Sequence, residues 1–402
     1  MPLKLAFVSM HTSPAAQPGS GDAGGMNVVE RAQGEHLAKL GHRIELITRR
    51  SSPDQPDIVE LSDGVFLRHL DGGPAAPLAK SAIDAHIPQF SANIGKLGGF
   101  DAIHSHHWMS GVAALPWAKT WGIPHVQSYH SVAALPNSGL SEGEPPESSA
   151  RVAGEAQCAR ESNAIVAISA AEAHTVISRC GATPDRVHII HPGVDHALFH
   201  PPGVGQARPA AKGTSGYVLF AARLQPLKAP DLAIRALAEV PAQIRPRLVV
   251  AGDVSEDFRA YEAELLALTA SLNLSGQVDF TGPLQRRELA RLMRGAQITL
   301  VPSYSETFGL VALEAQSSGT PVIASSAGGL REAVAHRETG YLMDSREPAD
   351  WGRAIVSLLS NAELLAAMGT VARVHARRFQ WRWAALQLED LYQKLISQGA
   401  SA

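Results

Sequence analysis

The fold prediction starts from one stretch of the chain, Glu306-Thr307-Phe308-Gly309-Leu310-Val311-Ala312-Leu313-Glu314. It follows the apolar run Ile298 to Val301, which is typical of a buried strand, and it predicts a helix that continues to Ser318. We expect Glu306 at the helix entrance and Glu314 about two turns further along, on roughly the same face. A helix N-terminus favours anions, and a carboxylate there can accept hydrogen bonds from hydroxyl groups. By itself, the pattern fits equally well a helix that carries two surface carboxylates.

Length, charge and cysteine content narrow the class of protein. A chain of 402 residues is too long for one typical core and predicts two domains. The net charge is −3 and no block of Lys and Arg is present, so nucleic acid is not an expected partner. Two cysteines, Cys158 and Cys180, cannot build a disulfide framework, and a reducing cytoplasm is expected. No signal peptide and no apolar run of membrane-spanning length is found, which predicts a cytoplasmic protein without a membrane span.

Strand and helix patterns alternate along the first half of the chain. Strands are expected at residues 3–10, 44–48, 100–106, 124–129, 164–168 and 187–190, and helices at 26–40 and 147–162. The composition then changes to the Pro/Gly/Ala-rich stretch 201–216, which predicts a linker. The alternation restarts with strands at 217–221, 247–251, 278–280, 298–301, 322–324 and 340–343, and helices at 231–240, 261–272, 286–293 and from 330.

The repeated alternation predicts an α/β fold that is built twice. Each half is expected to form a Rossmann-like, doubly wound parallel sheet with helices on both faces. The predicted domains are 1–200 and 217–378, joined by the linker 201–216, and an amphipathic helix over 379–402 is expected to pack back on the first domain. Because ligands bind at the carboxyl ends of parallel strands, the cleft between the two domains is the predicted site.

Two motifs suggest phosphate binding. The glycine-rich loop from Gln17 to Asn27 lies between the first strand and the first helix, where backbone N–H groups can face an anion. Arg223 and Lys228 follow the first strand of the second half and suit a pyrophosphate. The alternatives are a flexible surface loop and two solvated cations. Thr48-Arg49-Arg50 ends the second strand where a nicotinamide dinucleotide enzyme would carry an acidic residue, so a dehydrogenase is disfavoured.

Histidines cluster after the strand that ends near residue 106. His104, His106 and His107 could in principle hold zinc, but no Cys, Asp or Glu lies nearby in the sequence to complete a ligand set. We therefore expect histidines that make hydrogen bonds. His130 ends the next strand, and Arg151 opens a helix where a cation opposes the helix dipole. Each of these two residues is compatible with a structural role or with ligand binding, and Lys80, in a loop, is uninformative alone.

These residues together resemble a known family. Glu306-x-Phe308-Gly309 followed by Glu314, with Arg223 and Lys228, resembles the retaining nucleotide-sugar glycosyltransferases of family 4, which have the GT-B fold. The first strand end, the 17–27 loop and Ile103-His104-Ser105-His106 more narrowly resemble members that move N-acetylglucosamine from UDP-GlcNAc to inositol 3-phosphate in mycothiol synthesis. The resemblance extends over nearly the whole chain.

The resemblance implies a role for individual residues. His130 matches the active-site histidine, and His130, Glu306, Arg223 and Lys228 form the implied catalytic set. The implied donor-binding residues are His11, Gln17, Pro18, Gly25, Arg223, Lys228, Glu306, Phe308, Gly309, Leu310, Val311 and Glu314. The implied acceptor-binding residues are Asp22, Asn27, Lys80, His107, Ser131 and Arg151, with Lys80 and Arg151 on the acceptor phosphate.

The implied chemistry is transfer of a hexose with retention and release of UDP, with the UDP-sugar as co-substrate and no cofactor. No Asp-x-Asp motif lies near the pyrophosphate residues, so Mg²⁺ is not expected to be essential and no metal ligands are predicted. Members of this kind often carry Tyr at the position of His107 and Thr at that of Ser131, so a hexose phosphate stays open as the acceptor. A nicotinamide dehydrogenase and a non-catalytic nucleotide-sugar binder are less favoured alternatives, and a homodimer stays open.

Overall fold

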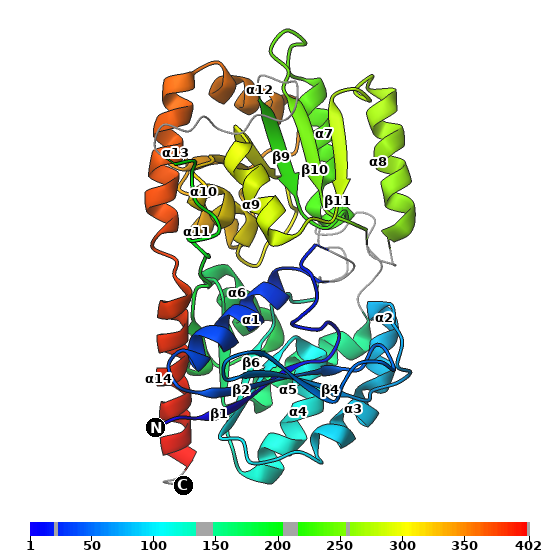
Figure 1. The fold of residues 1–402 in the computed structure, drawn as a ribbon, viewed down its shortest axis with the longest axis vertical. Helices are drawn as coiled ribbons and strands as arrows, with labels where there is room; N and C mark the ends of the chain where they lie inside the picture. Colours follow the sequence, from blue (N-terminus) through cyan, green and yellow to red (C-terminus); the bar gives the residue numbers. More distant parts are fainter. Residues whose placement is uncertain (20–22, 134–147, 204–215, 255–257, 400–402) are drawn as a thin grey trace.

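Two sheets organise the chain in the computed structural model, which describes residues 1–19, 23–133, 148–203, 216–254 and 258–399 (Figure 1). The first sheet has the order β3-β4-β2-β1-β5-β6-β7-β8, and only the β3/β4 pair is antiparallel. Its strands are β1 (Lys4–Ser9), β2 (Arg43–Arg49), β3 (Ile58–Ser62), β4 (Val65–Leu70), β5 (Ala102–His106), β6 (His125–Ser128), β7 (Ala164–Ala167) and β8 (Val187–Ile189).

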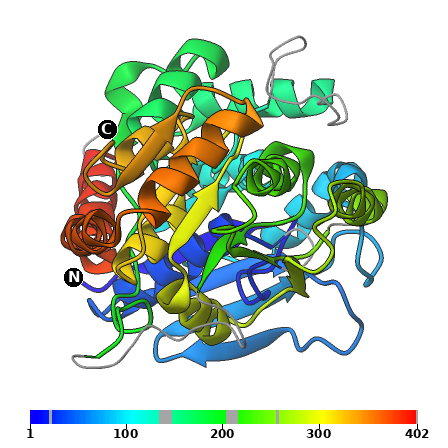
Figure 2. The same ribbon diagram turned by 90° about the horizontal axis from the view of Figure 1, so that it is seen from above.

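The second sheet is entirely parallel and has the order β11-β10-β9-β12-β13-β14. Helices cover both of its sides when the molecule is seen from above (Figure 2). Its strands are β9 (Tyr217–Ala221), β10 (Arg247–Ala251), β11 (Val278–Gly282), β12 (Ile298–Val301), β13 (Val322–Ser325) and β14 (Gly340–Met343). The prediction of two doubly wound α/β domains is confirmed.

The helices follow the strands in sequence. Those of the first half are α1 (Gly25–Ala38), α2 (Lys80–Ile83), α3 (Ile87–Ile94), α4 (Trp108–Trp121), α5 (Ser149–Glu161) and α6 (Ala170–Thr175). Those of the second half are α7 (Pro230–Ala238), α8 (Arg259–Ser271), α9 (Arg286–Gly295), α10 (Leu310–Ser317), α11 (Leu330–Ala333), α12 (Pro348–Leu359), α13 (Ala362–Ala376) and α14 (Trp381–Gly399). The predicted linker 201–216 falls largely on residues outside the described ranges, and its bounds stay a prediction.

The strand alternation determines which helices cover each face of the first sheet. On β1, Leu5 and Phe7 pack in the core that is shared with α1 and α14. Ala6 and Val8 point to the other face and pack against α3 and α4. Because both faces are apolar, the strands are buried on both sides, as is usual for parallel sheets. This burial fixes the register of the strands, and hence the edge at which their carboxyl ends lie.

The last helix returns to the first domain, as predicted. Figure 1 shows α14 beside the first sheet, whereas α13 lies along the second domain. Ala384, Leu388 and Tyr392 are buried in the first core, and the Tyr392 hydroxyl lies 2.6 Å from Nδ1 of His104. The two crossings between the domains run side by side, since Val194 N–H donates to the carbonyl of Phe379 at 3.1 Å. The chain therefore closes the first domain with its own C-terminal segment.

Two predicted elements differ from the structure. The helix of the opening stretch begins at Leu310 and not at Glu306, because Gly309 has a left-handed φ of 101° and residues 302–309 form a loop. Glu306 and Glu314 consequently do not share a helix face, and that prediction was wrong. Lys80 lies in the first turn of α2 and not in a loop.

Helix α4 carries no clear apolar periodicity in the sequence. The helix is buried around most of its circumference and contains Pro116, so it lacks the apolar stripe of a surface helix.

Among the described residues, no single helix is long and apolar enough to cross a membrane. One pair of helical segments, Pro348–Leu359 with Ala362–Gly399, is long and apolar enough when taken together, by length and composition only, but the pair is bent by 96°.

Buried histidines form a layer inside the first sheet. His104 contacts Tyr392 and, through Nε2, the Ser128 hydroxyl at 2.9 Å. His125 lies between the hydroxyls of Ser105 and Ser162, at 2.9 Å from each. Burial lowers the pKa of His125 to about 3 and the pKa of His104 well below its usual value. Both side chains are therefore neutral in the folded protein at neutral pH.

We expect Leu388→Ala to destabilise the first domain, because it leaves a cavity between α14 and the sheet. The free energy of unfolding should fall by about 2–5 kcal/mol, measured by urea denaturation. Gln387→Ala, on the exposed side of the same helix, is the matched control and should change it by less than about 0.5 kcal/mol. Equal effects of the two variants would contradict the packing of α14.

The buried histidines predict a loss of stability in mild acid. The folded pKa of His125 lies below the unfolded value of 6.5, so its contribution is fully present above pH 6.5 and is lost as the pH falls towards 3. Between pH 6.5 and the folded pKa, the buried neutral His125 lowers the free energy of unfolding by about 1.4 kcal/mol for each pH unit. His125→Gln cannot take up this proton. Its free energy of unfolding, measured in urea titrations, should therefore lie further below that of wild type at pH 7 than at pH 5. A deficit that does not vary with pH would argue against a neutral buried His125.

Candidate active site

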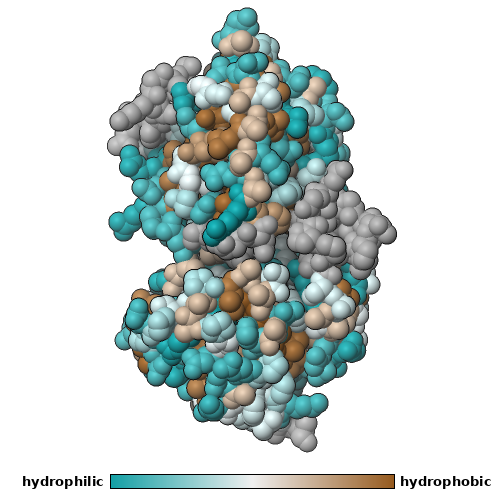
Figure 3. All heavy atoms as spheres, turned by 90° about the vertical axis from the view of Figure 1, so that its right-hand side faces the viewer, coloured by the Kyte–Doolittle hydropathy of each residue, from teal (hydrophilic) through white to brown (hydrophobic). Residues whose placement is uncertain are grey.

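The carboxyl ends of both sheets face a cleft of about 1200 Å³. Figure 3 shows the waist between the two domains from one side. In the first sheet the strand order reverses between β1 and β5, and in the second between β9 and β12. Such reversal points leave a crevice at the strand ends, where ligands of α/β proteins bind. The described residues of the predicted site line this cleft, apart from Gln17.

Two helix N-termini meet in the cleft. A Cβ added to Gly25, the first residue of α1, would lie only 3.4 Å from Cδ1 of Leu310, the first residue of α10. A Cβ on the neighbouring Gly24 would lie 3.5 Å from Nε of Arg223, which follows β9. The partial positive charges of both helix ends and one guanidinium therefore converge, an arrangement that favours a phosphate group.

Carboxylates and cations pair on the second-domain side. Lys228 Nζ lies 2.7 Å from Oε1 of Glu306, and the Ser303 hydroxyl donates to the same oxygen at 2.9 Å. Glu314 lies further along α10 and is bonded by Arg286 at 2.8 Å. Arg286, which opens α9, is not among the predicted site residues, because the sequence gives no signal for it beyond its charge. Each carboxylate is thus held by a cation while it lines the cleft.

Histidines line the first-domain side. His130 lies two residues beyond the end of β6, with a left-handed φ of 59°. Its Nε2 lies 2.8 Å from Nδ1 of His106, and burial lowers the pKa of His130 to about 3. Of the three histidines predicted to make hydrogen bonds, His104 and His106 do so, and His107 does not among the described residues. In the described part of the chain, no group of three or more His, Cys, Asp or Glu could hold a metal ion.

A second pair of histidines lies among cations from both domains. The rings of His11 and His107 are 4.2 Å apart, and both side chains line the cleft. Burial lowers the pKa of His11 well below its usual value, and the charges of Lys80, Arg223 and Arg151 lower it further. Both nitrogens of His107 are buried and have no hydrogen-bond partner among the described residues. The neutral His107 ring can thus offer one donor and one acceptor to a ligand.

Arg151 is more constrained than its position at a helix start suggested. Its Nε donates to Glu155 at 2.8 Å and its guanidinium to the Ser131 hydroxyl at 3.1 Å. The ion pair with Glu155 offsets the unfavourable helix dipole, so that position alone gives no argument for a ligand. Arg151 and Ser131 still line the cleft on the same side as Lys80.

The glycine-rich loop is held by its own asparagine. The Asn27 side chain accepts from the Gly24 N–H at 2.9 Å and donates to the Thr12 hydroxyl and the Ser13 carbonyl. Asn27 therefore shapes the start of α1, in addition to lining the cleft. Gln17 bonds Gln285 of the second domain at 2.5 Å, and Pro18 lines the cleft. Asp22 lies outside the described residues.

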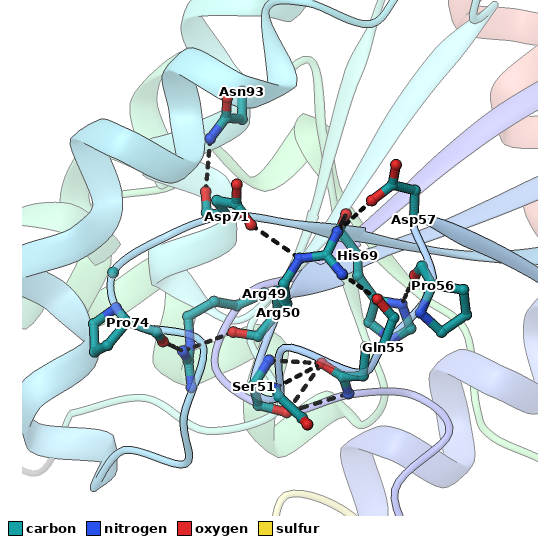
Figure 4. Close-up of polar contacts among 12 residues, drawn as sticks. Arg49, Arg50, Ser51, Gln55, Pro56, Asp57, His69, Asp71, Pro74 and Asn93 are labelled. Carbon is teal, nitrogen blue, oxygen red and sulfur yellow. Dashed lines mark hydrogen bonds and ion pairs between the residues drawn. The ribbon is translucent and has the colours of Figure 1, made fainter.

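The end of β2 contains a structural cluster in place of a dinucleotide site. Figure 4 shows Arg50 between Asp57 and Asp71, which it contacts at 2.5 and 2.9 Å. Arg49 points the other way and donates to the carbonyls of Pro74 and Ala76. Both arginines are engaged in holding loops, and neither could replace the acidic residue that would bind a ribose.

Comparisons with known proteins agree with this geometry. The family model Glycosyltransferase Family 4 matches residues 23–198, and Glycosyl transferases group 1 matches residues 206–375. Two similar relatives are the D-inositol 3-phosphate glycosyltransferases of Streptomyces coelicolor and Thermobispora bispora. Each is 39% identical over 98% of this chain, and the matches cover 92% and 95% of the relatives.

Solved structures extend the comparison. Sucrose-phosphate synthase from Thermosynechococcus elongatus is similar with a TM-score of 0.88 and 27% identity, covering 98% of this chain and all of that one. HepE of Anabaena, in complex with UDP-glucose, is similar in fold with a TM-score of 0.74 and 19% identity over 98% of this chain and all of that one. The chain belongs to the family 4 glycosyltransferases of the GT-B fold and is a hexosyltransferase.

Proposed function

We propose that the enzyme transfers N-acetylglucosamine from UDP-GlcNAc to inositol 3-phosphate with retention and releases UDP. The observation that carries the proposal is the presence of two anion-binding regions in one cleft. One consists of Arg223, Lys228 and the N-termini of α1 and α10. The other is built around Lys80 and Arg151 in the first domain. A donor diphosphate and an acceptor phosphate match these two regions.

The diphosphate is the leaving group of the proposed reaction. Negative charge grows on its oxygen as the bond to the sugar breaks, and Arg223 and Lys228 are positioned to stabilise it. The N–H groups of Leu310 and Val311, in the first turn of α10, would add to this stabilisation, because the N–H groups of a first helical turn have no acceptor within the helix. Glu306 would accept hydrogen bonds from sugar hydroxyls, and Glu314 from the ribose.

The acceptor is proposed to attack from the face that the diphosphate leaves. A leaving-group oxygen would take the acceptor proton, which requires no carboxylate base on the opposite face. The neutral His130 ring would orient hydroxyls without carrying charge. His107 and Ser131 would contact the acceptor ring, while Lys80 and Arg151 hold its phosphate. We also propose that no divalent cation is required, since two cations and two helix ends already face the diphosphate.

A hexose phosphate is the second candidate acceptor. It is favoured by the likeness to sucrose-phosphate synthase and by His107 and Ser131, whose side chains differ from the usual Tyr and Thr. Both candidates share a phosphate and several ring hydroxyls, so Lys80 and Arg151 would serve either. The names of the relatives favour inositol 3-phosphate.

Mass-spectrometric detection of product from UDP-GlcNAc tests the acceptor. Inositol 3-phosphate, glucose 6-phosphate and fructose 6-phosphate are offered in parallel, each with Mg²⁺ and with EDTA. We expect the glycosylated inositol phosphate as the main product and equal turnover in EDTA. A main product from a hexose phosphate would overturn the acceptor, and activity that EDTA abolishes and Mg²⁺ restores would overturn the metal-free proposal.

Arg223→Ala and Lys228→Ala are each expected to lower kcat about a hundredfold or more, equivalent to roughly 3–4 kcal/mol of transition-state stabilisation. The matched control is Arg291→Ala, which removes an exposed arginine of α9 outside the cleft and should leave kcat unchanged. Initial rates of UDP release at saturating substrate measure the effect. Turnover near that of wild type in both cleft variants would exclude this diphosphate site.

A further inference from the structure

One hydrogen bond joins the donor side of the cleft to His130. The Thr307 hydroxyl donates to the main-chain carbonyl of His130 at 2.6 Å, across the boundary between the two domains. Thr307 lies between Glu306 and Phe308, and it follows β12 of the second sheet. His130 follows β6 of the first sheet. The bond therefore connects the strand ends that face each other across the cleft.

His130 has a backbone conformation that needs support. A left-handed φ of 59° is uncommon for a residue other than glycine and persists where the surroundings hold it. The ring is held from inside the first domain, where it stacks on His106 at 5.1 Å with 15° between the planes. The carbonyl is held from the second domain by Thr307. His130 is thus fixed at both ends, and one of the two supports depends on how the domains meet.

The Thr307 loop is itself rigidly mounted. Gly329 N–H donates to the Glu306 carbonyl at 2.9 Å, and a Cβ on Gly329 would lie only 2.3 Å from the Thr307 carbonyl oxygen. The loop therefore packs directly on the segment that opens α11. Glu332 of α11 in turn accepts from the backbone N–H of Ala170 at 2.9 Å and lies 3.0 Å from His191 Nε2. The loop and α11 form one unit that contacts the first domain at two places.

We infer that the Thr307 hydroxyl is a positioning group, which fixes His130 against the donor side when the two domains meet. The inference rests on the proposed function in that His130 acts at the sugar. Donor binding uses other groups, because the Lys228–Glu306 pair and the helix N-termini need no hydroxyl from Thr307. Loss of the hydroxyl should therefore lower kcat and leave the affinity for UDP unchanged.

Thr307→Val removes the hydroxyl and keeps the shape, and Thr307→Ser keeps the hydroxyl as the matched control. Thr307→Val should lower kcat about five- to tenfold, the effect of one neutral hydrogen bond, with UDP affinity by calorimetry within about twofold. Thr307→Ser should restore kcat to within about twofold of wild type. Both variants should unfold at the wild-type temperature, because Thr307 is only half-buried.

Hydrogen exchange gives a second readout that does not depend on turnover. In the UDP complex, amides 129–131 should exchange faster in Thr307→Val than in wild type and at the wild-type rate in Thr307→Ser. Unchanged exchange in Thr307→Val overturns the inference even if no acceptor supports turnover. A parallel loss of UDP affinity and kcat also overturns it, because Thr307 would then serve the donor. An inactive wild-type enzyme with normal UDP binding counts against the proposed acceptors alone.

Discussion

The meeting of the N-termini of α1 and α10 is the contact on which the cleft depends. Each helix starts at the carboxyl end of a strand next to the reversal point of its own sheet, so the two domains present equivalent ends to each other. The approach is close because Gly25 has no side chain and because Gly309 turns the chain through a left-handed conformation. Two positive helix ends this close repel each other unless an anion lies between them. The proposed diphosphate, bound between the two helix ends, would remove this repulsion.

The aromatic packing around Phe308 connects that contact to the crossings between the domains. Phe308 is buried, and its ring lies 5.6 Å from His191 and 5.5 Å from Phe379. His191 precedes the first crossing and Phe379 lies on the second, where its carbonyl is bonded by Val194. The residue that follows Thr307 thus packs on both connections. A rearrangement of residues 302–309 would therefore shift the crossings between the domains, and a movement of the crossings would shift this loop.

Much of the fold could be predicted from the sequence, because buried parallel strands are short apolar runs and some helices, such as α7 and α9, carry a clear apolar stripe. Helix α4 was not predicted, because its burial on most sides removes the apolar stripe of an amphipathic helix. The start of α10 was predicted too early, because the spacing of apolar residues does not reveal the left-handed conformation of Gly309. The candidate site residues are predicted from a motif resemblance, which gives their positions and not their interaction partners. The Arg286–Glu314 pair joins α9 to α10 within the second domain, and the Thr307–His130 bond joins the two domains. Both pairings are long-range in the sequence and leave no local pattern. The Arg151–Glu155 pair was within reach, since it follows i,i+4 spacing.

The return of α14 to the first domain has a consequence for synthesis. Residues 384–392 are part of the core of the first sheet, packed on Leu5 and Phe7, although they are synthesised after the second domain. While the second domain is being made, one face of the first sheet lacks its cover, and its apolar side chains are open to water or to other chains. The N-terminal domain thus completes its fold only after the second domain has emerged.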